Sequence, residues 1–289
     1  MKLVTFLHHA ETHLGALIAR DTGNFILDLN RAQPSLPSDM LALLNAGESA
    51  LNMARSIANR AEEKFLLAES AATLLAPVPR PGKIICIGHN YHGHTSATPP
   101  THPDIFAKFN NVVLAPRQPI IIPREASQVD YEGELAVVIG KRVRRVAQDR
   151  ALDFVAGYTI FNDVSARDLQ KRQSQWTFGK SPDTFGPMGP ALVTPDEIGD
   201  VGNLDLSLWV NGELRQHAST RDLIFSVPFL VAYLSELITL KPGDLISTGT
   251  PSGTGASQKP PVFLQPGDVV KIAIEKIGVL ENPVAAEIS

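Results

Sequence analysis

The sequence has little cysteine, no long apolar run and no large excess of charge of one sign. Its single cysteine, Cys86, excludes a disulfide within the chain and fits a reducing compartment. The N-terminus has no apolar core of signal-peptide length, and no segment is long enough to cross a membrane. These absences predict a cytoplasmic protein without a membrane partner.

The charge balance gives no sign of a nucleic-acid surface. The 26 basic and 30 acidic side chains leave a formal net charge of −4 over 289 residues. The one basic cluster, residues 141–145, follows a predicted strand and is interrupted by Val143, which is typical of a solvated turn. We therefore expect no nucleic-acid partner. The 44% of hydrophobic residues in a chain of this length is enough for one large domain with a small appendage.

Short apolar runs between glycine and proline turns predict a β-rich α+β protein. The clearest strands cover residues 83–87, 119–122, 135–139, 155–161, 204–210 and 269–274. Asn211-Gly212 is a strong hairpin signal, and helices are expected over residues 165–172 and 226–237. Because strands and helices do not alternate regularly, a Rossmann or TIM-barrel architecture is excluded.

The first 76 residues are predicted to form a small α+β domain. Strands are expected over 2–7, 16–20 and 25–29, a helix from a Ser38 cap through Leu44, and a second helix over 50–67. Three prolines in residues 77–82 indicate a stiff linker. We therefore place the domain boundary there, with the main domain over residues 83–289.

The most informative segment is residues 129–140, which contains two glutamates at the mouth of an apolar strand. Side chains alternate across a strand, so Glu132 and Glu134 point to the same side. Two neighbouring carboxylates at a buried position repel each other and lose hydration. A divalent cation with oxygen ligands is the simplest group that offsets this cost.

Asp163 is a third candidate ligand, because it follows the predicted strand 155–161. A carboxylate at this place either caps the following helix or contacts a metal, and the nearby Glu-x-Glu pair favours the metal. Three oxygen ligands that leave open positions suit Mg²⁺, Mn²⁺ or Ca²⁺, and no Cys/His set has zinc-ligand spacing. Such an ion can chelate a 2-oxo acid and stabilise its enolate.

Other side chains offer groups for substrate binding. Arg167 and Gln170 lie three residues apart on a predicted helix, where Arg167 either clamps a carboxylate or forms a surface ion pair with Asp168 or another neighbour. Lys180 follows a glycine in an aromatic segment and is either an oxyanion partner or simply solvated.

Two turn-rich loops complete the candidates. Residues 88–94 contain three histidines, for which a general base is favoured over a metal site because no further His/Cys set accompanies them. Residues 248–253 offer hydroxyls and backbone N–H groups to an anion, without the ending of a P-loop.

Together these segments resemble the fumarylacetoacetate hydrolase family over about residues 83–283. The motifs that carry the resemblance are Gly88-x-Asn90-Tyr91-x-x-His94, Asp130-Tyr131-Glu132-Gly133-Glu134-Leu135, Asn162-Asp163-Val164-Ser165-Ala166-Arg167-Asp168, Gly179-Lys180-Ser181, Asn211-Gly212-Glu213 and Thr248-Gly249-Thr250-Pro251. The resemblance implies a mixed β-sandwich roll around a buried metal site, preceded by a small α+β N-terminal domain and assembled as a homodimer.

The resemblance also implies roles for individual residues. It implies Mg²⁺ or Mn²⁺, with Ca²⁺ as a substitute, on Glu132, Glu134 and Asp163. It makes His94 the histidine that activates water and Lys180 its electrophilic partner. The residues that it places near the substrate are Tyr91, Arg167, Gln170 and Thr250.

Two positions depart from the family pattern. Hydrolytic and decarboxylating members that resemble this chain usually carry a glutamate three residues after the catalytic histidine, where this chain has Ala97. Asp104 is the first carboxylate downstream, beyond several prolines. His89 stands where relatives often have Arg or Leu and where the eukaryotic namesake has an acidic metal ligand, which leaves a fourth, nitrogen ligand as an alternative.

Three hypotheses about function follow. The first is metal-dependent hydrolysis of a C–C bond in a β-diketo acid of the acylpyruvate or fumarylpyruvate type, with a place in the catabolism of aromatic compounds. The second is a tautomerase, isomerase or decarboxylase of 2-oxo or 2-hydroxy-enoic acids, such as oxaloacetate or 2-hydroxyhepta-2,4-diene-1,7-dioate. Ala97 motivates it, since enolisation needs no activated water. The third is a non-catalytic ligand-binding protein.

Overall fold

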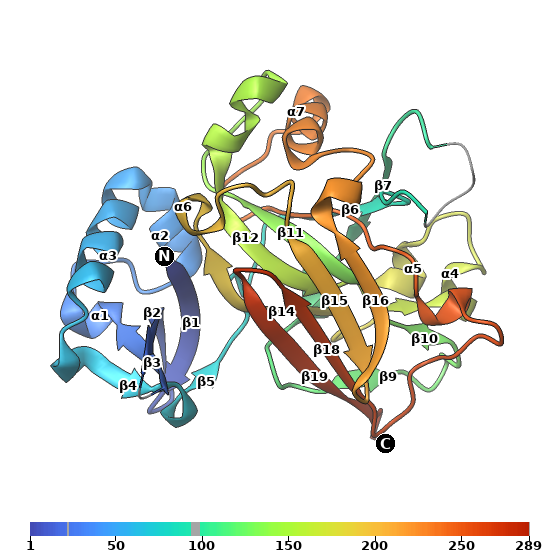
Figure 1. Cartoon of the computed structure of the whole chain (residues 1–289), viewed down its shortest axis with the longest axis horizontal. Coiled ribbons are helices and arrows are strands. Elements are labelled where there is room, and N and C mark those ends of the chain that lie inside the picture. Colours follow the sequence, from blue (N-terminus) through green and yellow to red (C-terminus); the bar gives the residue numbers. More distant parts are fainter. Residues whose placement is uncertain (22, 94–98, 289) are drawn as a thin grey trace.

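The computed structural model describes residues 1–21, 23–93 and 99–288, and these form a 12-stranded sheet, a five-stranded sheet and a two-stranded sheet (Figure 1). The predicted β-rich α+β class is confirmed. None of the helices in the described ranges is long and apolar enough to span a membrane.

The 12-stranded sheet contains strands from both predicted domains. Its spatial order is β4 (Leu66–Ala68), β3 (Gly23–Asp28), β2 (Glu11–Arg20), β1 (Lys2–His8), β14 (Gly186–Val193), β12 (Val155–Asn162), β11 (Gly133–Ile139), β17 (Leu245–Ser247), β6 (Ile84–Gly88) and β7 (Asp104–Lys108), with β5 (Thr73–Leu74) on β1 and β8 (Val113–Leu114) on β14. Because β1 pairs with β14, the N-terminal unit continues the sheet of the main unit. The domain boundary at residues 77–82 stays a prediction.

The second large sheet packs against this one. Its order is β16 (Glu213–Ser219), β15 (Asp205–Val210), β18 (Val269–Ile274), β19 (Gly278–Ala286) and β9 (Ile120–Ile122). Asn211 and Gly212 connect β15 to β16 with φ angles of 52° and 81°, which confirms the hairpin, since two-residue turns between twisted strands need positive φ at both positions. A Cβ on Gly133 would meet Leu208 and Ile272, so β11 lies directly against this sheet.

Helices are short and lie outside the sheets. They are α1 (Leu29–Ala32), α2 (Met40–Ala46), α3 (Glu48–Arg60), α4 (Arg167–Gln170), α5 (Thr177–Lys180), α6 (Pro195–Ile198) and α7 (Val227–Leu237). Single 3₁₀ segments cover Glu63–Phe65, Glu69–Ala71, Asn110–Val112, Gln148–Phe154, Thr220–Asp222 and Gly255–Ser257. Figure 1 shows α1, α2 and α3 beside the N-terminal strands, and α4 and α5 near the end of the sheet that carries β6 and β7.

Three predicted helix limits are wrong. The helix predicted over 50–67 ends at Arg60, because Ala61 takes a left-handed conformation with φ 42° and the chain then joins β4. The cap of α2 is Asp39 rather than Ser38, and its carboxylate accepts from Ala42 N at 2.8 Å. The helix predicted over 165–172 begins only at Arg167, because β13 (Ser165–Ala166) pairs with β10 (Val129–Asp130).

Every residue of β11 and β12 is buried. Most of these residues are apolar, as expected for strands covered on both faces, but Glu134 lies within β11. An ionised group at such a position requires charged or hydrogen-bonding partners, because burial without them is very costly. The centre of the fold therefore directs attention to the polar groups at this end of the strands.

Gly157→Ala tests the close approach of β12 to β14. A Cβ at Gly157 would lie 2.3 Å from the carbonyl oxygen of Val193, so the two strands must separate to admit it. We expect the free energy of unfolding to fall by roughly 1–3 kcal/mol in urea titrations. Gly202→Ala is the control, since its Cβ meets only the end of the Asp200 side chain. Equal stability of the two variants would contradict this packing.

Candidate metal and substrate site

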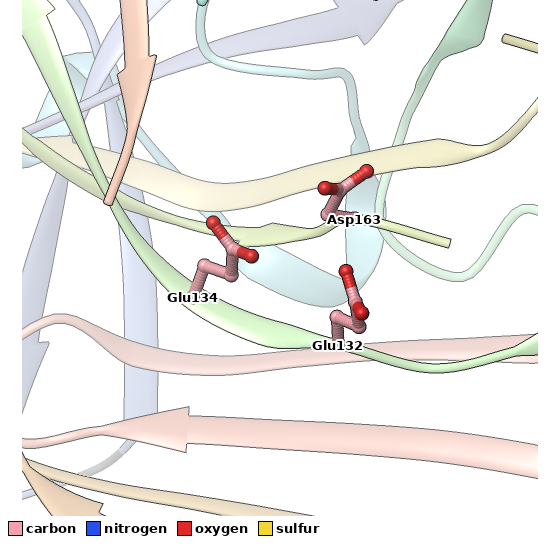
Figure 2. A group of neighbouring side chains, drawn as sticks. All are labelled: Glu132, Glu134 and Asp163. Carbon is pink, nitrogen blue, oxygen red and sulfur yellow. The ribbon is translucent and has the colours of Figure 1, made fainter. Parts of the chain in front are cut away.

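Three buried carboxylates meet at the end of β11 and β12. Glu132, Glu134 and Asp163 each offer a ligand atom, and these atoms lie within 4.8 Å of one another (Figure 2). The strand register explains the arrangement, because Gly133 pairs with Asn162 and Asp163 N donates to Glu132 O at 2.9 Å. Figure 2 shows Glu132 and Glu134 on the same side of their ribbon, as strand alternation predicts. The predicted ligands are therefore brought together.

Glu134 forms no ion pair with a described cation, unlike Glu132 and Asp163. Its Oε2 accepts from Ser247 Oγ at 2.6 Å and from Gly249 N at 2.8 Å. Among the described residues no hydrogen bond reaches its Oε1. Burial, followed by the charges of Asp163 and Glu132, raises the pKa of Glu134 well above its ordinary value. A cation beside Oε1 would relieve both effects.

Lys180 bridges the other two carboxylates. Its Nζ donates to Glu132 Oε2 at 2.6 Å and to Asp163 Oδ2 at 2.8 Å, and the side chain is buried. Burial alone would lower the pKa of Lys180, but the two carboxylates outweigh it and raise this pKa above its usual value. The lysine is thus a fixed ammonium rather than a solvated one. An ammonium has three N–H donors, so one remains for a substrate oxygen.

Lys108 is a second buried lysine, which the sequence analysis missed. It ends β7, and its Nζ donates to Asp163 Oδ1 at 2.5 Å and to Val164 O at 2.9 Å. Burial lowers the pKa of Lys108, while the Asp163 carboxylate opposes this effect. The alternative role of Asp163 as a helix cap is wrong, because its carboxylate accepts from two lysines and the N-cap of α4 is Ala166. The available signal was the shared strand face of Phe106 and Lys108.

Arg167 is anchored by Asp130, to which the sequence analysis gave no role beyond its place in a motif. Its Nε donates to Asp130 Oδ2 at 2.9 Å, and Nη2 pairs with Glu132 Oε1. Asp130 in turn accepts from Gly255 N and Ala256 N. The alternative surface pair with Asp168 is wrong, since the Asp168 carboxylate accepts from Ser127.

The cluster as a whole carries a formal charge of −1. Its four carboxylates outnumber its three cations by one, and the members are Asp130, Glu132, Glu134, Asp163, Lys108, Arg167 and Lys180. The ligand atoms that the triad offers to a metal are hard carboxylate oxygens, which fit Mg²⁺, Mn²⁺ or Ca²⁺.

A cavity of about 500 Å³ opens above the cluster. Its wall includes the triad and several predicted substrate-binding residues, namely Arg167, Gln170, Lys180 and Thr250. The hydroxyl of Thr250 donates to Gly133 O at 3.0 Å and accepts from Gln216 Nε2, so its own proton is already used. A larger cavity of about 780 Å³ lies elsewhere, beside β2 and β19, away from this cluster.

Tyr91 is fully buried and is not among the residues that line this cavity. Its hydroxyl has no hydrogen-bond partner among the described residues. Burial, then the charge of Glu134, raises the pKa of Tyr91 above its ordinary value. The predicted contact of Tyr91 with substrate therefore stays a prediction.

The predicted catalytic histidine, His94, and the departing position Ala97 both lie outside the described residues. Asp104, the candidate replacement for the missing glutamate, pairs with a different histidine, since His89 Nδ1 lies 2.8 Å from Asp104 Oδ2. His89 also lines the cavity.

Comparisons with known proteins agree with this geometry. Residues 83–285 match the family model described as fumarylacetoacetate (FAA) hydrolase C-terminal. The chain is 47% identical over 270 residues to an oxaloacetate tautomerase of Xenopus laevis, which covers 92% of this chain and 84% of that protein. It is 44% identical over 290 residues to an oxaloacetate tautomerase of Rattus norvegicus, which covers 98% and 91%.

Two solved structures extend the comparison to the whole chain. A 2-hydroxyhepta-2,4-diene-1,7-dioate isomerase from Mycobacterium marinum has a TM-score of 0.81 at 34% identity, with 100% of both chains covered. Maleylpyruvate hydrolase from Sphingobium sp. SYK-6, in complex with manganese(II) and pyruvate, has a TM-score of 0.82 at 32% identity, also with full coverage. Tautomerases and isomerases thus fit the sequence better than the first hypothesis of C–C hydrolysis.

The cytoplasmic location expected from the sequence is wrong by the same comparison. The relatives from Xenopus laevis and Rattus norvegicus are both named as mitochondrial proteins. The absence of a signal-peptide core, on which the expectation depended, does not distinguish these two compartments.

Binding of Mg²⁺ or Mn²⁺ to the triad is expected to release protons and to tighten as the pH rises. The raised pKa of Glu134 means that a proton still competes with the cation above the ordinary glutamate range, and this competition weakens only as the pH rises through the raised pKa. Calorimetric titration in buffers of different ionisation enthalpy measures the release. Glu134→Gln is the control and should bind at least about tenfold more weakly. Heats that do not depend on the buffer would contradict the prediction.

Proposed function

Because the chain belongs to the fumarylacetoacetate hydrolase family, we propose that it is a metal-dependent tautomerase of 2-oxo dicarboxylic acids of the oxaloacetate class. The buried carboxylate triad at the cavity carries this proposal. Its relatives at 44–47% identity are named oxaloacetate tautomerases, which supports the substrate class.

In this proposal Glu132, Glu134 and Asp163 hold Mg²⁺ or Mn²⁺. If bound there, a divalent ion would supply Lewis-acid stabilisation to the enolate of a 2-oxo acid. The three oxygen donors fit such an ion, and the similarity to a manganese-binding hydrolase supports the same chemistry.

The cations of the cluster would bind and orient the substrate. Lys180 has one N–H that is not used by Glu132 or Asp163, and a fixed donor of this kind stabilises negative charge that develops on the 2-oxo oxygen. Arg167 donates through Nη1 to Gln170 Oε1, which leaves another Nη1 hydrogen for a substrate carboxylate. Because ion pairs fix both groups in advance, little reorganisation is needed during the reaction.

Tautomerisation makes fewer demands on this site than hydrolysis does. Enolisation moves one proton and leaves the carbon chain intact, whereas hydrolysis also requires an oriented, activated water. Ala97 stands where the family resemblance implies a glutamate that orients the water-activating histidine. The sequence and the named relatives therefore favour the same reaction class.

Metal-loaded enzyme is expected to accelerate enol–keto exchange of oxaloacetate. The exchange is measured as the loss of enol absorbance. Glu134→Gln should lower kcat at least about 100-fold, because it removes a charged ligand. Glu281→Gln, on the exposed face of β19, is the matched control and should behave as wild type. Hydrolysis is measured in the same screen with acylpyruvates and maleylpyruvate as substrates. Preferential cleavage of those compounds would sink the tautomerase proposal, and turnover unchanged by Glu134→Gln would favour a non-catalytic protein.

We also propose that the chain forms a homodimer through the edge of the 12-stranded sheet. Among the residues that the structure describes, β7 at the end of this sheet pairs on one edge only, and two large apolar side chains near it are exposed, Ile105 by 45% and Phe109 by 63%. Open edges and exposed apolar side chains favour association with another chain.

Light scattering coupled to size exclusion tests this assembly. We expect twice the mass of a single chain for the wild type, and a shift toward the single-chain mass for Phe109→Glu, because a buried unpaired charge destabilises an interface. Leu214→Glu, at another exposed apolar position, is the control. A wild-type protein with the mass of one chain would contradict the dimer.

A further inference from the structure

We infer that His89 and Asp104 form an acid–base pair that exchanges the proton on carbon 3 of the 2-oxo acid. The inference rests on the proposed function and adds the group that moves the proton. It assigns His89 as a catalytic residue and Asp104 as a positioning residue.

The register of two strands creates this pair. Gly88 of β6 lies opposite Asp104 of β7, so His89 follows directly after the last paired position. On a regular strand its side chain would point to the face opposite Asp104. His89 instead has a φ of 55°, which breaks the alternation, and its imidazole Nδ1 lies 2.8 Å from Asp104 Oδ2. This left-handed conformation is sparsely populated by residues other than glycine, and it turns the imidazole toward Asp104.

An aromatic wall connects the pair to the buried charges. The rings of His89 and Trp176 meet edge to face with centroids 5.6 Å apart, and Trp176 meets Phe106 at 5.3 Å. The ammonium of Lys180 lies 4.8 Å from the centre of the Phe106 ring. A Cβ at Gly88 would lie 2.8 Å from Trp176, so only glycine allows the indole to lie here. His89 therefore borders the same cavity as the triad.

The hydrogen bond gives the imidazole the correct tautomer for a base. A carboxylate only accepts hydrogen bonds, so the proton of neutral His89 is on Nδ1 and the lone pair is on Nε2. Asp104 also stabilises the imidazolium that forms when Nε2 takes up a proton.

The other ionisable groups described in the cavity wall are unsuited to this task. The three carboxylates of the triad are the proposed metal ligands, and Lys180 and Arg167 are held as cations by ion pairs. Lys171 is exposed at the wall, and no hydrogen bond to a described residue orients its side-chain amine. Imidazole is the side chain that ordinarily exchanges protons near neutral pH.

The proton balance requires no further reactant. Nε2 takes the proton from carbon 3, the C–H electron pair forms the bond between carbons 2 and 3, and the carbonyl electrons move to the 2-oxo oxygen. This oxygen then takes up a proton from water to give the enol. The imidazolium returns its own proton to water, which reaches it because the His89 side chain is 47% exposed.

Two simpler roles make different predictions. A structural ion pair with side chains 47% and 52% exposed contributes little to stability, so neither substitution should unfold the protein. A nitrogen ligand to the metal would require His89 for metal affinity. The described geometry groups only the three carboxylates as metal ligands.

His89→Gln and Asp104→Asn test the pair in the full-length, Mn²⁺-loaded enzyme. His89→Gln should lower kcat for enol–keto exchange and the rate of deuterium incorporation at carbon 3 by roughly 10²–10³-fold, with KM within about threefold of wild type. Asp104→Asn should lower kcat by about 10-fold, and Asp104→Glu should restore part of the loss. Mn²⁺ affinity and melting temperature should be unchanged in all variants. His102→Gln, whose ring stacks on Tyr233, is the matched control.

Each contrary result has a separate meaning. An active wild type with an equally active His89→Gln overturns this inference alone, and so does a His94→Gln variant that loses exchange while His89→Gln keeps it. Loss of Mn²⁺ affinity in His89→Gln would make the residue a ligand and would also overturn the inference. A wild-type enzyme that does not accelerate exchange of oxaloacetate overturns the proposed function and this inference with it.

Discussion

The ammonium of Lys180, held between Glu132 and Asp163, is the contact on which the centre of this protein depends. These groups lie at the end of β11 and β12, two strands that are buried throughout. Breaking a buried ion pair leaves an uncompensated charge and typically costs about 3–5 kcal/mol. Lys108 and Arg167 extend the same compensation outward, each through a carboxylate of the cluster. The strands can therefore bury acidic groups only as part of this connected set.

The set of ion pairs also decides where chemistry can take place. Lys108, Lys180 and Arg167 neutralise most of the acidic charge but leave an excess of one carboxylate, and Oε1 of Glu134 lacks a donor among the described residues. Because water is largely excluded there, electrostatic interactions are stronger than at the surface. A divalent ion bound there would satisfy Glu134 at little structural cost, since the carboxylates of the triad are already fixed by their other partners. Stability and preorganisation thus come from the same contacts.

The sequence predicted the acidic part of this site and missed part of its basic support, for physical reasons. Glu132 and Glu134 are two residues apart on a strand, so local periodicity placed them on one side. The partner of Lys108 is 55 residues away, and only the folded sheet brings the two together. The helix predicted from Ser165 failed for a similar reason, because pairing with β10 outweighed its local helical pattern. Contacts between distant segments, rather than residue type, account for these errors.

The division between buried and exposed charge explains how one scaffold can serve related reactions. In the proposed function the cluster around Lys180 would supply charge stabilisation that any enolate of a 2-oxo acid can use, and nothing in it distinguishes hydrolysis from proton transfer. The reaction must therefore be decided by groups at the rim of the cavity, where protons and water enter. His89 and Asp104 lie at that rim, half exposed and joined to Lys180 through Trp176 and Phe106. A histidine there can exchange its proton with solvent without disturbing the ion pairs beneath it, which is what repeated enolisation without bond cleavage requires.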